Sequence, residues 1–65
     1  MKKNKIVILG GGESGIGTAI LGKKEGFEVF VSDYGKIKKK YKQVLLHHEI
    51  NWEEEAHSET EILSA

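Results

Sequence analysis

The sequence predicts an α/β protein built on a parallel sheet, and two observations support that class. Apolar, β-branched runs typical of strands alternate with segments of helical spacing along the 65 residues. The first of these runs leads into a glycine turn with G-x-G-x-x-G spacing. Alternating strands and helices favour parallel strands joined by right-handed crossovers. We therefore expect the first β-α-β-α-β-α half of a Rossmann-like sheet: one truncated domain over residues 1–65, with no further domain in this chain.

The first strand and the first helix flank the glycine turn. Ile6–Leu9 is a continuous apolar run, which is typical of a parallel strand covered on both faces of its sheet. The spacing after the turn predicts a helix from about Ser14 to Glu25, with Gly26 as its left-handed stop. A glycine inside this helix, Gly22, indicates close packing of the helix against the strands.

The second strand and the second helix are joined by a short turn. Residues 27–32 are predicted as a strand because β-branched and aromatic residues dominate them. Asp33 ends this strand, and Tyr34–Gly35 forms the turn. A helix is then expected from Lys36 to about His47, with apolar residues on one face.

The last elements are predicted from two other signals. Apolar and polar residues alternate in 50–53, so we expect an edge strand with one wet face. Residues 58–61 form a capping box that opens a third helix through Leu63. Because no further strand is predicted, the outer edge of the first strand, Lys5–Leu9, is open and apolar. Such an edge favours pairing with another chain, so we expect a homodimer or a swapped assembly of these 65 residues.

Composition narrows the function classes. All ten basic residues are Lys, and Arg, Cys and Pro are absent. Residues 1–45 carry a net charge of +6 and residues 46–65 one of −6, which we interpret as two differently charged solvent faces.

The longest apolar run is far shorter than the roughly 20 residues of a membrane span, so we expect a cytoplasmic protein without membrane contact. The lysines of 36–42 point around the helix with few aromatic residues between them, so no nucleic-acid partner is expected. No metal site is expected from the histidines, which lack Cys partners and an H-x-x-x-H pair: His47, His48 and His57.

The glycine turn is the main candidate site. Gly10, Gly12 and Gly15 place bare backbone N–H groups and a helix N-terminus where a diphosphate can bind. Asp33 lies 18 positions beyond Gly15, close to the spacing of an acidic residue that reads a ribose or a base. Glu13 disfavours a diphosphate unless its side chain points away, whereas the Ser14 hydroxyl is expected to cap the helix or to contact a phosphate oxygen.

These residues leave several functions open. The G-x-x-x-x-G-K-[ST] phosphate loop is absent from the sequence, so ATP is not expected at this turn. The turn and Asp33 also suit the adenosine ribose of an NAD(P)-binding oxidoreductase. A non-enzymatic nucleotide-binding module is a third hypothesis. The simplest alternative is a glycine turn that serves only the packing of the helix on the strand.

Two longer stretches resemble a known family. Residues 7–15 and 29–33 are similar to the N-terminus of the Mur ligases, and among these to the D-glutamate-adding group. Residues 47–54 and 57–59 resemble members of Bacteroidetes type, so that the resemblance covers essentially the whole chain.

The resemblance implies an ATP-dependent amide ligase of peptidoglycan and cell-wall synthesis. Such enzymes add D-glutamate to UDP-N-acetylmuramoyl-L-alanine in the cytoplasm: ATP and magnesium serve to phosphorylate the substrate carboxylate, and the amine of D-glutamate then attacks. In that family the N-terminal domain holds the UDP group, whereas ATP and D-glutamate bind in domains that this chain lacks. We therefore expect no catalytic residue, no metal ligand and no cofactor in these 65 residues, and no activity from them alone.

The resemblance also assigns substrate-binding residues. Those that would face the diphosphate are the residues of the turn: Gly10, Gly12, Glu13, Ser14 and Gly15. Asp33 would accept a hydrogen bond from the uracil ring N–H, and Tyr34 would lie beside the ring. Gly35 stands where some members have Arg, so the neighbouring Lys36 is the expected source of any cationic contact.

Overall fold

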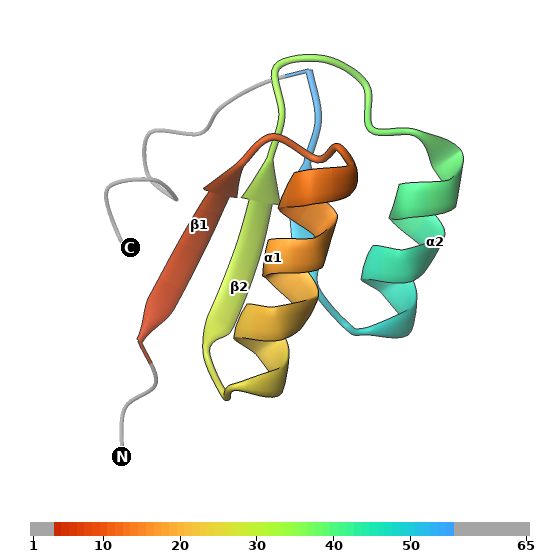
Figure 1. Cartoon of the computed structure of the whole chain (residues 1–65). Coiled ribbons are helices and arrows are strands. Elements are labelled where there is room, and N and C mark those ends of the chain that lie inside the picture. The colour runs from red at the N-terminus through yellow and green to blue at the C-terminus, as the bar shows by residue number, and fades with distance from the viewer. Residues whose placement is uncertain (1–3, 56–65) are drawn as a thin grey trace.

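Three parallel strands and two helices alternate along the chain in the computed structural model, which describes residues 4–55 (Figure 1). The elements are β1 (Lys5–Leu9), α1 (Glu13–Lys24), β2 (Glu28–Ser32), α2 (Lys39–His47) and β3 (Asn51–Glu53). This order confirms the predicted α/β class and the Rossmann-like half. The third helix predicted from residue 58 lies outside the described residues.

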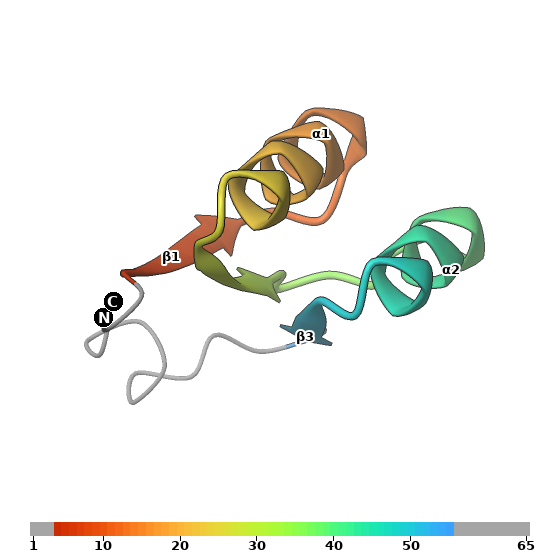
Figure 2. The ribbon, with the colours of Figure 1, turned by 90° about the horizontal axis from the view of Figure 1, so that it is seen from below.

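The sheet has the strand order β1-β2-β3, with β2 in the centre. Both strand pairs are parallel, and the register places Val7 opposite Phe30 and Val31 opposite Trp52. The chain moves across the sheet in the same direction in both β-α-β connections. Because such connections have the same handedness, their helices lie on the same face of the sheet. Figure 2 shows α1 and α2 together on that face. Within residues 4–55, the prediction that the third strand lies at an edge is confirmed.

The expectation that the first strand is covered on both faces is wrong for the described residues. Ile6 and Ile8 lie against the glycines of α1, whereas Val7 is only half-buried and Leu9 is 63% exposed. The reason is the shared face of the two helices, because neither α1 nor α2 reaches the other side of the sheet. The continuous apolar run therefore identifies the strand correctly but not its surroundings in this part of the chain.

The hydrophobic core lies between the sheet and the two helices. Every element except β3 contributes at least one buried side chain, and two buried residues come from the segments just before α2 and β3. The buried apolar residues are Ile8, Ile16, Ala19, Val29, Val31, Ile37, Leu45 and Ile50. Trp52 and Tyr41 pack partly buried against this cluster, so Trp52 is a packing residue at the edge of the core.

Helix α1 packs very closely on the strands. A methyl group on Gly15 would overlap the carbonyl oxygen of Gly10, and one on Gly22 would lie 3.2 Å from Cγ2 of Val29. Glycine at position 15 therefore allows a helix-to-strand distance that no larger residue permits, and a residue at position 22 has little room for a side chain. At the other end of the helix, Gly26 has a φ of 93°, which confirms the predicted left-handed stop.

Helix α2 begins at Lys39, three residues later than predicted. Residues 36–38 remain non-helical because tertiary contacts fix them. The Ile37 side chain is buried, and its backbone N–H donates to Oε2 of Glu54 at 2.9 Å. Lys38 then takes an extended backbone as the residue before the helix. Helical periodicity placed Ile37 on the correct apolar face but could not reveal this distant partner.

Two glycines of α1 give opposite expectations for stability. Gly17 faces open space, so Gly17→Ala should raise the free energy of unfolding by about 1 kcal/mol through helix propensity. Gly15→Ala should lower it by about 2–3 kcal/mol, because the added methyl group meets backbone that cannot rotate away. Urea unfolding of the two variants measures both changes. Equal effects would contradict the close packing at Gly15.

Candidate functional site

The carboxyl ends of the three strands meet at one edge of the sheet. The glycine turn follows β1, the loop with Asp33 follows β2, and Glu54 follows β3 (Figure 1). Ligands of open α/β sheets bind at this edge, where loops and helix N-termini converge. All the substrate-binding residues assigned from the sequence lie in these loops or in the first turn of α1.

Backbone hydrogen bonds shape the glycine turn. Gly10 has a φ of 117°, which favours glycine, and its N–H donates to the Ser32 carbonyl at 2.7 Å. Gly12 is the N-cap of α1, and no side chain caps the helix. Ser14 is the second residue of the helix, so the expectation that its hydroxyl caps the helix is wrong. Its carbonyl instead accepts a hydrogen bond from the Thr18 hydroxyl.

The start of α1 presents backbone N–H groups that donate no hydrogen bond within the helix. The first intrahelical hydrogen bond runs from the Ile16 N–H to the Gly12 carbonyl at 2.9 Å. The N–H groups of residues 13–15 come before that bond and have no acceptor within the helix. Together with the positive end of the helix dipole, they make this point favourable for an anion.

A cavity of about 430 Å³ lies against these donors. Its lining residues are Leu9, Gly10, Gly12, Glu13, Ser14, Gly15 and Thr18. The structure thus brings together all five turn residues assigned from the sequence and adds two that were missed. Thr18 lies one helical turn after Ser14, and that i, i+4 spacing was the signal that could have found it. Among residues 4–55 no lysine lines the cavity, so in this part of the chain backbone groups rather than cationic side chains supply its attraction for anions.

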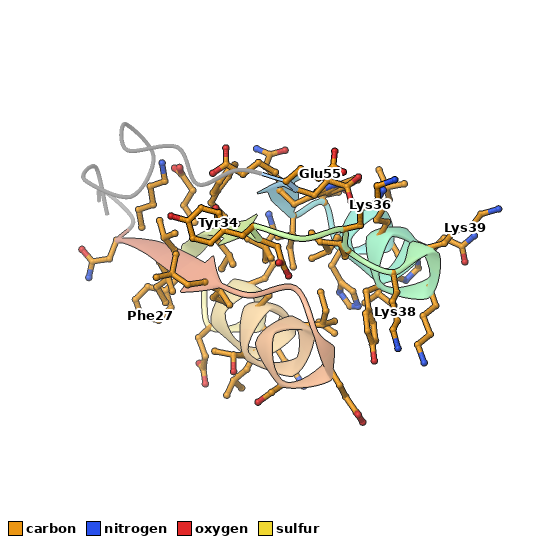
Figure 3. The ribbon with its side chains drawn as sticks, turned by 90° about the horizontal axis from the view of Figure 1, so that it is seen from above. Phe27, Tyr34, Lys36, Lys38, Lys39 and Glu55 are labelled. Carbon is orange, nitrogen blue, oxygen red and sulfur yellow. The ribbon has the colours of Figure 1, made fainter. Side chains whose placement is uncertain are left out.

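Asp33 lies apart from this cavity and connects two loops. Its Oδ2 accepts the Gly11 N–H at 2.7 Å, and its Oδ1 accepts the Gly35 N–H at 2.9 Å. The carboxylate therefore ties the glycine turn to the loop after β2. Tyr34 is 75% exposed, and Figure 3 shows its side chain over the end of the sheet, away from α1.

A second connection involves a residue that the sequence analysis missed. Glu54 accepts the Ile37 N–H through Oε2 and forms an ion pair with Lys42 through Oε1. The hydrogen-bonded Lys42 ammonium and the Ile37 N–H hold the pKa of Glu54 below its ordinary 4.5. Nearby, Lys36 and Glu55 form a longer, exposed pair at 4.0 Å (Figure 3). An acidic run after a strand was visible in the sequence, but its partners 17 and 12 positions away were not.

The opposite edge of the sheet holds another cavity, of about 420 Å³. It is lined by Lys5, Glu28, Val29, Phe30, Asn51 and Trp52, with the Lys5 ammonium 5.8 Å from the centre of the Phe30 ring. This cavity lies at the amino ends of the strands and has no helix N-terminus beside it. Within residues 4–55, no helix is long and apolar enough to cross a membrane, and no group of three His, Cys, Asp or Glu could hold a metal ion.

Comparison with known proteins identifies the family. The family model described as the MurD N-terminal domain matches residues 5–63. The chain belongs to this family. The resemblance to the D-glutamate-adding Mur ligases is therefore confirmed, and the match argues against the NAD(P)-binding oxidoreductase that the glycine turn and Asp33 alone left open.

Several curated relatives carry the name UDP-N-acetylmuramoylalanine–D-glutamate ligase. Those of Christiangramia forsetii and Bacteroides fragilis are 70% and 57% identical over 61 residues, or 94% of this chain. That of Porphyromonas gingivalis is 54% identical over 63 residues, or 97% of this chain. The chain spans only 14% of the length of each relative. No solved structure gives a significant match.

In this MurD N-terminal domain, the Glu54 contact predicts a pH dependence of stability. A carboxyl whose pKa is lowered by folding stabilises the fold above its unfolded pKa, and this contribution is lost as the pH falls through the folded value. The charges that face Glu54 are those of Lys42 and Lys36. The stability advantage of the wild type over Glu54→Gln should therefore be full above pH 4.5 and shrink below it.

Urea titrations of both proteins at several pH values measure this advantage. Glu55→Gln is the control, because its exposed pair at 4.0 Å should contribute little at any pH. A gap between wild type and Glu54→Gln that stays constant down to about pH 3 would contradict the assignment.

Proposed function

We propose that this chain is the UDP-binding N-terminal part of a UDP-N-acetylmuramoylalanine–D-glutamate ligase of peptidoglycan synthesis. The observation that carries the proposal is the cavity at the start of α1, formed by the glycine turn of a MurD N-terminal domain. The 70% identity to a relative of that name supports the choice of D-glutamate as the added amino acid. The absence of Cys is consistent with work in the cytoplasm.

The diphosphate of the substrate is proposed to bind in that cavity. The N–H groups at the start of α1 would donate to phosphate oxygens, and the helix dipole would add a favourable field. Glu13 is exposed, so its side chain can turn toward solvent and leave the cavity to the anion. A hydroxyl from Ser14 or Thr18 offers a further donor in the same lining.

The uracil ring is proposed to bind above the loop after β2. Asp33 is already oriented by two backbone hydrogen bonds, from the Gly11 N–H and the Gly35 N–H. A carboxylate oxygen can accept more than one hydrogen bond, so the Asp33 carboxylate would also accept one from the ring N–H. Tyr34, exposed over the end of the sheet, would provide an apolar surface beside the ring.

The amide-forming chemistry is assigned to parts of the ligase outside these residues. The sequence lacks a phosphate loop for ATP, and no group of acidic or histidine residues within 4–55 could hold magnesium. The glycine turn and the loop with Asp33 would therefore bind and orient the UDP end of UDP-N-acetylmuramoyl-L-alanine. ATP and D-glutamate would bind in the rest of the ligase, and the 65 residues alone would be inactive.

Binding of UDP is the direct test. In a nuclear magnetic resonance titration of the 65-residue chain, UDP should shift the amide signals of Glu13, Ser14 and Gly35, and NADH should not. Asp33→Asn should weaken UDP binding about tenfold, because one oriented acceptor is lost. Glu28→Gln, at the far end of β2, is the charge-matched control and should bind as the wild type does. Stronger binding of NADH than of UDP would overturn the proposal.

The same substitutions can be tested in a complete ligase. In the Christiangramia forsetii relative, residues 5–63 of this chain would replace the matching segment. Asp33→Asn should raise the KM for the UDP substrate and leave the KM for ATP unchanged. An inactive graft that is folded by circular dichroism would count against the ligase assignment.

We also infer that the 65-residue chain pairs with a second copy through β1. The only strand hydrogen-bonded to β1 among the described residues is β2, which leaves the outer edge of β1 at the border of the sheet. An exposed Leu9 adds apolar surface to that edge. Edges of this kind pair with other strands unless charge or proline protects them.

Light scattering at high concentration should give twice the chain mass of 7.3 kDa. Val7→Lys places a charge in the middle of β1 and should shift the mass toward that of one chain. A monomer mass for the wild type at every concentration would refute the pairing.

A further inference from the structure

We propose that Glu54 is a positioning residue for the nucleotide site. It would hold the loop after β2 against the glycine turn and so keep the two halves of the site in register. The inference rests on the proposed UDP-binding function and adds a residue from the third strand end, which lies outside the glycine turn and the Asp33 loop.

Glu54 reaches the loop by two contacts at once. One carboxylate oxygen accepts the Ile37 N–H at 2.9 Å, and the other pairs with the Lys42 ammonium on α2. The Glu54 side chain is 25% exposed and that of Lys42 32%, so water competes only partly for these contacts. The carboxylate thus fixes the loop where residues 36–38 pass from β2 to α2.

Ile37 transmits this constraint to the glycine turn. The Ile37 side chain is 3% exposed and packs directly on Gly11. A Cβ added to Gly11 would lie 2.7 Å from Cγ1 of Ile37. A movement of the Ile37 backbone would therefore remove the support beneath Gly11. Because protein cores are close-packed, such a movement is passed on to neighbouring groups.

Gly11 is the point where the two connections meet. Its N–H is held by Asp33 from the loop, and its backbone is supported by Ile37. Gly10 and Gly12, its neighbours in the chain, line the proposed diphosphate cavity. Loss of the Glu54 contacts should therefore misalign the cavity and the Asp33 carboxylate relative to each other, although Glu54 touches neither.

The neighbouring Glu55 provides a matched control. Its side chain is 61% exposed and pairs only at 4.0 Å with Lys36, which is 80% exposed. Its backbone N–H donates to the Gly35 carbonyl at 2.9 Å, and a side-chain substitution leaves that bond in place. Glu55→Ala removes the same charge from the adjacent position without breaking a contact to Ile37.

The test compares UDP affinity of the full 65-residue chain and its variants at a temperature where each is folded. Glu54→Ala should weaken UDP binding about tenfold, in line with the cost of a small misplacement of binding groups. Glu54→Gln keeps an acceptor for the Ile37 N–H and should lose less, and Glu55→Ala should bind as the wild type does. In the grafted ligase, Glu54→Ala should raise the KM for the UDP substrate but not the kcat or the KM for ATP.

The outcomes separate the two proposals. If the wild type fails to bind UDP in either protein, the proposed function is wrong. If the wild type binds UDP and folded Glu54→Ala binds equally well, the function stands and the positioning role of Glu54 is overturned. A loss of kcat together with an increase in both KM values would also overturn it, because that pattern indicates general destabilisation.

Discussion

The approach of α1 to the end of β1 is the constraint on which this structure depends. The absence of a side chain at Gly15 lets the helix begin directly against the Gly10 carbonyl. That distance aims the first N–H groups of the helix into the cavity and places Ile16 and Ala19 in the core. Packing and the candidate site therefore arise from one contact, and a change that separates the helix from the strand would affect both.

Most of the fold was predictable from local patterns. The apolar runs, the glycine turn and Gly26 defined β1, α1 and β2 to within one residue, because strand and helix periodicity are local properties. The start of α2 was not predictable, because Ile37 is held by Glu54 from 17 positions away. Burial of the first strand on both faces was also misjudged, since an apolar run does not say which elements cover it.

The candidate site divides in the same way. The five turn residues were found because glycine spacing reflects backbone conformation, and all five line one cavity. Asp33 was identified by its spacing from Gly15 in the sequence. Its hydrogen bonds with the N–H groups of Gly11 and Gly35 became clear only in the structure. Glu54 carried no motif, because its proposed role depends on a contact with the loop between β2 and α2, 17 positions away. Local sequence thus predicted most of the groups proposed to touch a ligand, Thr18 excepted, and the tertiary structure was needed for those that support them.

A cavity whose donors belong to the main chain has a consequence for how such a site changes over time. The side chains of Leu9, Ser14 and Thr18 also line this cavity, and substitutions there can change the fit of a ligand without removing the main-chain donors. The positions that resist change are those where any side chain is excluded, above all Gly15. The main-chain donors of the candidate site therefore persist through side-chain substitutions, as long as the backbone keeps its conformation.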